Sequence, residues 1–170
     1  EQVFGSSLKE DYLMSKKLQF RGDHERWTYF VWKRPAAAAC AILLCKNEVL
    51  IIKRTTKSAA HPGEWSLPGG FLDTDKETLE DCCVREANEE LGVSLDKNKL
   101  QLFSVDSGPL TDPRTHVICA MYILKLDEKP DISVSDDAID FAWKNLADIA
   151  SGKIKLAFNH NETLKKVYLR

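Results

Sequence analysis

The sequence lacks the patterns that would place it in three large classes of protein. No apolar run approaches the length of a membrane-spanning helix, and the longest, at 36–45, suits a buried strand better. Neither sign of charge dominates, because 24 basic residues stand against 26 acidic ones, and this balance argues against a nucleic-acid-binding surface. Residues 1–20 contain no signal-peptide pattern, since Lys and Glu interrupt every apolar stretch. We therefore expect neither a membrane nor a nucleic acid as partner.

The cysteines also lack a metal-binding pattern. None of the five forms a Cys-x-x-Cys spacing, which argues against a zinc site: Cys40, Cys45, Cys82, Cys83 and Cys119. Three of them lie in apolar runs, where reduced cysteine behaves as a small core residue. A reducing compartment is the simplest setting for such an odd set, and we expect the cytoplasm.

The chain shows no internal repeat or low-complexity segment, and 170 residues predict one domain with a single core. β-prone and apolar segments predict strands at 27–32, 36–44, 49–53, 100–105, 116–126 and 141–143. Helical patterns predict helices at about 77–91, 145–150 and 157–169. This order predicts an α/β (α+β) sandwich with a mixed β-sheet. We assign 34–170 to the domain and 1–33 to an N-terminal accessory segment or strand arm.

The helix predicted at 77–91 is rich in acid and poor in base. Six carboxylates lie between Glu77 and Glu90, and Arg85 is the only base among them. An isolated helix gains nothing from like charges three and four residues apart, because they repel. A divalent cation reverses that cost, since magnesium prefers carboxylate oxygens, usually with substrate phosphates completing its shell. The alternative is a solvated acidic face, which is the commoner meaning of a lone Glu-Glu pair.

The spacing of this helix separates the acids from an apolar stripe. Three glutamates fall within roughly a 100° arc of one face: Glu86, Glu89 and Glu90. An adjacent stripe repeats every fourth position and can anchor the helix to a core: Cys83, Ala87 and Leu91. Arg85 is next to the acidic arc, where a bidentate contact would orient one carboxylate. Gly92 suits the left-handed position that ends a helix.

This stretch resembles the signature of the Nudix hydrolases. The signature runs Gly, five residues, Glu, seven residues, then Arg-Glu-aliphatic-any-Glu-Glu-any-Gly-aliphatic. Here six residues separate Gly70 from Glu77, and the run from Arg85 to Val93 matches throughout. The extra residue falls in the loop at 73–75 and leaves the helical carboxylates in register. We therefore expect activity to survive it, while the role of Glu77 stays open.

The resemblance covers roughly 34–165, with landmarks at 34–36, 50–54 and 63–70. Segments 112–114, 136–143 and 156–160 resemble the branch of ADP-ribose pyrophosphatases and related proteins of NAD metabolism. The resemblance implies a Nudix-type α/β/α sandwich and a magnesium-dependent pyrophosphatase, with ADP-ribose cleaved to AMP and ribose 5-phosphate. The alternatives are a nucleoside triphosphate, a dinucleotide polyphosphate or a nucleotide sugar as substrate, or a non-catalytic metabolite sensor. Sensors often carry a degraded signature, whereas the acidic residues here are intact.

The resemblance also assigns the metal-binding and catalytic residues. It implies that magnesium, or manganese in its place, binds four groups: Glu86, Glu89, Glu90 and the carbonyl of Gly69. Arg85 would orient the carboxylates, or would form only an ordinary helical pair with Glu89. The general base is either Glu86 or an acid of a late loop, Asp137 or Asp136. Both aspartates have the alternative of being exposed turn residues.

Substrate contacts are assigned to two arginines and to the Gly-Gly turn. Arg54 and Arg114 are candidates to bind phosphate or ribose, because the guanidinium group forks onto such groups. Their alternative is a surface salt bridge. Gly69 and Gly70 would let the backbone approach the ligand closely. We expect His160 to be a structural hydrogen-bonding residue, a small-molecule nucleotide as substrate, and a homodimer as one option for assembly.

Overall fold

The computed structural model describes residues 2–4, 15–21, 26–32, 35–73, 76–135 and 137–170. These residues form two compact units, Glu1–Pro35 and Ala36–Arg170. The first unit contains an antiparallel sheet of β1 (Gln2–Phe4), β2 (Ser15–Arg21) and β3 (Arg26–Trp32), in that order. The strand β3 confirms the prediction at 27–32, whereas β1 and β2 were not predicted. The accessory role of this segment stays a prediction.

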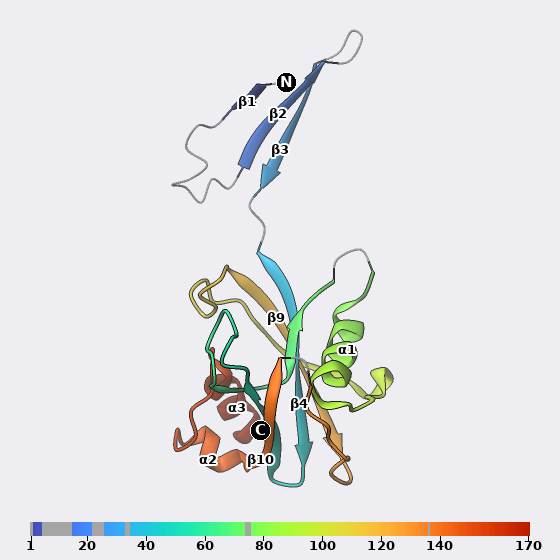
Figure 1. Ribbon diagram of the computed structural model, residues 1–170, viewed down its shortest axis with the longest axis vertical. Helices are drawn as coiled ribbons and strands as arrows, with labels where there is room; N and C mark the ends of the chain where they lie inside the picture. The colour runs from blue at the N-terminus through green and yellow to red at the C-terminus, as the bar shows by residue number, and fades with distance from the viewer. Residues whose placement is uncertain (1, 5–14, 22–25, 33–34, 74–75, 136) are drawn as a thin grey trace. The chain divides into compact units, whose positions relative to one another are not determined.

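The second unit is built on a mixed seven-stranded sheet (Figure 1). Its main path runs β10-β5-β4-β9-β8, with β6 paired to β5 and β7 paired to β4. Only β4 and β9 run parallel among the described pairs, and they pair over their whole length. The strands are β4 (Ala36–Cys45), β5 (Glu48–Arg54), β6 (Trp65–Ser66), β7 (Gly69–Phe71), β8 (Gln101–Asp106), β9 (Val117–Leu126) and β10 (Ala138–Asn145).

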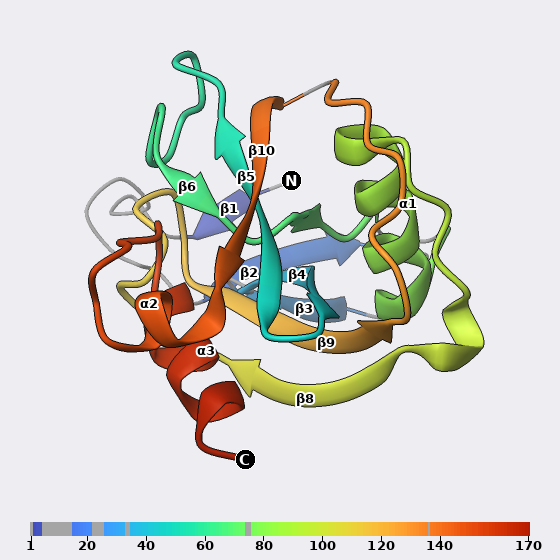
Figure 2. The same cartoon turned by 90° about the horizontal axis from the view of Figure 1, so that it is seen from below.

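Helices cover both faces of this sheet. Alternate residues of β4 point to opposite faces, so this apolar strand contributes to two cores. Ala39, Ala41 and Leu43 pack with α1 (Leu79–Leu91). Cys40, Ile42 and Leu44 pack with α2 (Leu146–Ala150) and α3 (His160–Tyr168). Figure 2 shows α1 on one side of the strands and α2 with α3 on the other. The predicted α/β/α sandwich is confirmed.

The helix α1 begins two residues later than predicted. Thr78 caps it, because its side chain accepts from the Asp81 N–H while the Asp81 carboxylate accepts from the Thr78 N–H. Glu77 therefore lies before the helix. The predicted apolar stripe at Cys83, Ala87 and Leu91 is buried in the core. The helix ends at Gly92 with φ 67°, in the predicted left-handed conformation.

Other boundaries differ where tertiary pairing decides them. The predicted strand at 141–143 is the centre of β10, which continues from 138 to 145 because it pairs with β5 over that range. The predicted helix at 157–169 begins only at His160, since Phe158 has φ 58° and breaks the helical path. A short 3-10 helix covers Lys97–Lys99. Among the described residues, no helix combines the length and apolar character that crossing a membrane requires.

Candidate active site

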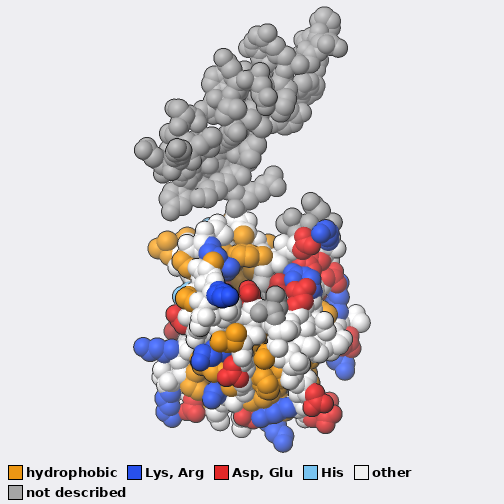
Figure 3. Space-filling model, viewed as in Figure 1, with side chains coloured by type: hydrophobic (Ala, Val, Ile, Leu, Met, Phe, Trp, Pro, Cys, Tyr) orange, Lys and Arg blue, Asp and Glu red, His pale blue; other side chains and the backbone are white. Residues whose placement is uncertain are grey.

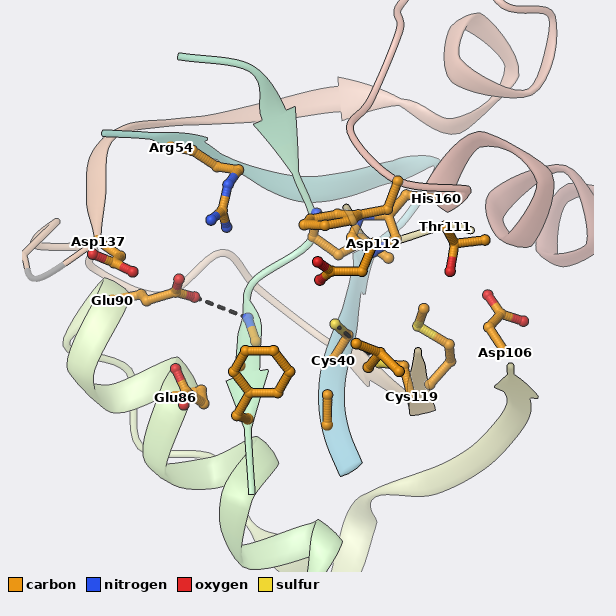
Figure 4. A pocket seen from close by; sticks show the side chains of 18 of the residues that line it. Cys40, Arg54, Glu86, Glu90, Asp106, Thr111, Asp112, Cys119, Asp137 and His160 are labelled. Atoms are coloured by element: carbon orange, nitrogen blue, oxygen red, sulfur yellow. Dashed lines mark hydrogen bonds between the residues drawn. The ribbon is translucent and has the colours of Figure 1, made fainter. Parts of the chain in front are cut away.

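A pocket of about 330 Å³ lies where β4, β7 and β9 meet α1 and the segment that leads into α3. This volume is in the range of roughly 300–1,000 Å³ that is typical of small-ligand pockets. Figure 4 shows Glu86, Glu90, Asp137 and Arg54 at one end and Asp106 with Thr111 at the other. On the face shown in Figure 3, acidic side chains gather on the side of α1.

The Gly-Gly turn brings the backbone of β7 against both β4 and α1. Gly69 has φ 147°, and a Cβ atom there would stand 2.3 Å from the carbonyl oxygen of Ala39. A Cβ atom on Gly70 would stand 2.4 Å from Oε1 of Glu86. A Cβ atom on Gly69 would collide with backbone, so only glycine fits there, whereas a Cβ atom on Gly70 would displace the end of the Glu86 side chain. The carboxylate of Glu86 consequently lies directly against the turn.

Glu90 is the buried carboxylate of the pocket. Only 2% of the residue is exposed, and its Oε2 accepts a hydrogen bond of 2.9 Å from the Gly69 N–H. Burial, together with the nearby charge of Glu86, raises the pKa of Glu90 to about 8. Two carboxylates thus share one end of the pocket at an electrostatic cost, which a cation would remove.

Arg85 joins three carboxylates. Its Nη1 lies 2.7 Å from Glu86 and 2.8 Å from Glu89, while Nε and Nη2 donate to the two oxygens of Glu77 at 3.0 and 2.9 Å. Its Nη2 also donates to the carbonyl oxygen of Phe71 at 3.0 Å. These contacts exceed an ordinary helical pair with Glu89. They also give Glu77 a structural role, because its carboxylate orients Arg85. The hydrogen bonds from Arg85 in turn lower the pKa of Glu77.

The donor set of this end fits a hard divalent cation. Glu90 accepts from the Gly69 N–H, Glu86 lies against Gly70, and Glu89 lines the same pocket. No ready cluster of three or more His, Cys, Asp or Glu ligands is formed within the described parts of the chain. Arg85 binds both Glu86 and Glu89, at 2.7 and 2.8 Å.

The two predicted arginines both line the pocket. Arg54 is 6% exposed, its Nε donates to the carbonyl oxygen of Ala60 at 3.0 Å, and its guanidinium lies 5.5 Å from the ring of Phe158. A surface salt bridge is thereby excluded for Arg54. Arg114 forms a two-pronged ion pair with Asp112 at 2.7 and 3.0 Å and stacks 4.5 Å from the ring of Phe71. Arg114 and Asp112 both line the pocket, so this ion pair forms part of its wall.

The late-loop acids are only partly described. Asp137 is exposed and lines the pocket, and its carbonyl oxygen accepts from the Thr55 N–H at 2.9 Å. Asp136 lies outside the described residues. Figure 4 shows Asp137 at the same end of the pocket as Glu86 and Glu90.

The comparisons with known proteins agree with this geometry. The NUDIX domain matches residues 32–168. The chain belongs to the NUDIX domain family. It is 36% identical over 156 residues to an ADP-ribose pyrophosphatase of Methanocaldococcus jannaschii. This match covers 92% of this chain and 85% of that protein.

Solved structures share the NUDIX fold. The NUDIX domain of Shewanella oneidensis NrtR, complexed with ADP ribose, has a TM-score of 0.71 at 23% identity, covering 82% of this chain and 90% of that chain. A bifunctional NMN adenylyltransferase/ADP ribose pyrophosphatase of Francisella tularensis, complexed with AMP and a Mn ion, has a TM-score of 0.70 at 24% identity. That match covers 81% of this chain and 42% of that chain.

Several pocket residues of this NUDIX domain were not predicted as site residues. They come from segments far apart in the sequence: Asp106, Thr111, Asp112, Phe158 and Asn159. Asp112, Phe158 and Asn159 lie in segments that carried the resemblance, but no spacing in the sequence joins the five residues, and the fold brings them together. His160 has the structural role that we expected, because its Nδ1 accepts a 3.1 Å hydrogen bond from the Leu67 N–H. Burial lowers the pKa of His160 to about 3, so the ring is neutral.

Proposed function

We propose that this protein is a metal-dependent pyrophosphohydrolase that cleaves ADP-ribose to AMP and ribose 5-phosphate. The carrying observation is one pocket that holds two neighbouring carboxylates, the half-buried Glu86 and the buried Glu90, against the Gly69–Gly70 turn. The relative from Methanocaldococcus jannaschii supports the choice of substrate, because it is named an ADP-ribose pyrophosphatase.

In this proposal the glutamates of the pocket bind the metal and the arginines bind the diphosphate. A divalent cation, magnesium or manganese, supplies charge neutralisation at the phosphate oxygens and lowers the pKa of a water molecule. Glu86, Glu89, Glu90 and the carbonyl of Gly69 are the groups that would hold it. Arg54 lies at the same end and would bind phosphate oxygens through its guanidinium fork. Arg114 is the second candidate for the same contact.

The attacking water needs a base within hydrogen-bond reach. We assign Glu86 to this role, because it is mostly buried against the turn while Asp137 is exposed. Arg85 would hold the Glu86 carboxylate in place through the 2.7 Å contact. Asp137 remains the alternative base.

Release of AMP from ADP-ribose tests the function. With magnesium, we expect a kcat/KM for ADP-ribose at least tenfold above those for ATP, diadenosine polyphosphates, NADH and UDP-sugars. A chelator should abolish turnover, and manganese should restore it. Preference for another substrate on the panel would keep the mechanism and reassign the substrate. No turnover on the whole panel, with the metal still bound, would favour a metabolite sensor.

Setting and assembly are further parts of the proposal. All five cysteines are free thiols in the described structure, and the thiol of Cys119 donates a 3.4 Å hydrogen bond to that of Cys40. We propose the cytoplasm, a reducing compartment, as the setting of this protein. A homodimer is the assembly that we propose to test by light scattering.

A further inference from the structure

The end of the pocket that lies away from the glutamates is also built from polar side chains. Asp106 ends β8, Thr111 lies in the following loop, and Asn159 precedes α3. Figure 4 shows Asp106 and Thr111 across the pocket from Glu86 and Glu90. Nothing in the proposed hydrolysis of the diphosphate uses these three residues.

Two residues, one in α3 and one at its N-terminal cap, hold the Asp106 side chain in place. Its Oδ2 accepts a 2.5 Å hydrogen bond from the hydroxyl of Thr163 and a 3.3 Å bond from the amide of Asn159. Thr163 is buried, so this contact holds the carboxylate in one orientation. Both hydrogen bonds from the described residues go to Oδ2, so Oδ1 is the oxygen that would accept from a ligand. The pocket therefore presents an oriented acceptor far from its metal-binding end.

We propose that Asp106 determines substrate specificity by binding the uncharged, hydrogen-bond-donating end of the substrate. A carboxylate accepts from hydroxyl or amino groups and repels phosphate. The vicinal hydroxyls of a ribose and the amino group of adenine have this chemistry, and a terminal phosphate does not. This inference rests on the proposed function, in which each half of the substrate carries a group of this kind.

Thr111 supports the same chemistry. Its hydroxyl donates to the carbonyl oxygen of Gly108 at 2.9 Å, so towards the pocket this oxygen can act as an acceptor. Two acceptors at one end match a ligand with two neighbouring donors. A nucleoside triphosphate with its terminal phosphates at this end would meet repulsion from Asp106, which favours a substrate whose ends are both uncharged.

The test replaces Asp106 with asparagine and keeps its shape. We expect Asp106→Asn to lower kcat/KM for ADP-ribose by between about 10-fold and 100-fold, through a higher KM with kcat nearly unchanged, because hydrogen bonds to a charged group are of this strength. Asp140→Asn is the matched control, since this exposed residue lies outside the pocket and loses the same charge. It should leave kcat/KM unchanged.

Two products assign the contact to one half of the substrate. AMP carries the adenine and ribose 5-phosphate carries the terminal ribose, and the binding of each to wild type and to Asp106→Asn is measured by thermal shift. The half that Asp106 binds should lose about as much affinity as the substrate, while the other product binds unchanged. Equal binding of both products to both proteins, or a fall in kcat alone, would overturn the proposal.

Thr163 provides a second variant that leaves the carboxylate in place. Thr163→Val removes the hydroxyl that orients Asp106 and should raise KM in the same direction, whereas Thr163→Ser keeps the hydroxyl and should restore it. An unchanged KM in Thr163→Val would contradict the orienting contact. Failure of the wild type to hydrolyse ADP-ribose would refute the proposed function by itself, and the product-binding comparison would still decide the role of Asp106.

Discussion

Two helices on opposite faces of the sheet hold the same short segment, Leu67-Pro68-Gly69. From α1, Glu90 accepts the Gly69 N–H, and from α3, His160 accepts the Leu67 N–H. Both side chains are buried, and burial disfavours the charged form of each. It therefore raises the pKa of Glu90 to about 8 and lowers that of His160 to about 3.

The neighbours of the two groups explain why only Glu90 is proposed as a metal ligand. Glu90 lies beside Glu86, so a cation arriving at this end would favour its ionised form. His160 lies near Arg54 and His61, which disfavour a proton on its ring. Glu90, on the side of α1, would thus ionise when a metal binds, whereas His160, on the side of α3, stays neutral. Burial shifts both pKa values, and the neighbouring charges make Glu90 the proposed metal ligand and His160 a neutral structural group.

Removing the charge on the side of α1 should have the largest effect. Glu90→Gln keeps an acceptor for the Gly69 N–H, so we expect it to fold. It loses the charge that would hold the cation, and kcat should fall by between about 10²-fold and 10³-fold in magnesium. Steady-state hydrolysis of ADP-ribose measures this, with metal affinity from calorimetry.

Glu162→Gln is the matched control for this variant. Glu162 is exposed in the first turn of α3 and lies outside the pocket, so its loss should leave kcat unchanged. Full turnover in Glu90→Gln would show that Glu90 is not a metal ligand. Glu90 would then be a structural support of the Leu67–Gly69 segment, as His160 is.

Removing the support on the side of α3 should have a smaller effect of a different kind. His160→Ala leaves the Leu67 N–H buried without its acceptor and opens a cavity, so the melting temperature should fall by roughly 4–10 °C. The turn would be less well placed, and kcat should fall by about tenfold with metal affinity nearly unchanged.

His160→Asn returns an acceptor at a similar position and should recover part of both losses. Circular dichroism melting and steady-state kinetics on the three proteins provide the comparison. A loss of magnesium affinity in His160→Ala as large as in Glu90→Gln would show that the support and the ligand cannot be separated.

The sequence predicted the site residues of α1 far better than the contact that His160 of α3 makes. The glutamates and Arg85 share one helix, so their spacing alone places them on one face. The contact between His160 and Leu67 joins residues 93 positions apart. No local pattern encodes such a contact, and His160 was correctly expected to be structural without a partner being named.

The fold shows the same division between local and distant causes. The long strands β4 and β9 and the end of α1 at Gly92 follow from apolar runs and from glycine chemistry. The short strands β6 and β7 exist because β5 and β4 pair with them, so the sequence does not mark them. Asp106 was missed for that reason as well, since its neighbours Asn159 and Thr163 come from the other end of the chain.

The opposite pKa shifts predict opposite effects of pH on the stability of the metal-free protein. Between pH 4.5 and about 8, the folded protein holds a proton on Glu90 that the unfolded chain releases, so the stability falls as the pH rises through this window. Between about 3 and 6.5, the unfolded chain protonates His160 while the folded protein does not, so the stability falls as the pH falls. Above pH 6.5 only the effect of Glu90 remains.

Melting temperatures in a chelator from pH 6.5 to 8 isolate that effect. We expect a decrease of a few degrees in the wild type and a flat profile in Glu90→Gln, because glutamine has no proton to release. Magnesium should reverse the trend, since it binds the ionised carboxylate and its stabilisation therefore grows with pH up to about 8. A parallel decrease in both proteins would assign the effect to another group. In that case the raised pKa of Glu90 would not be the cause of the fall in stability.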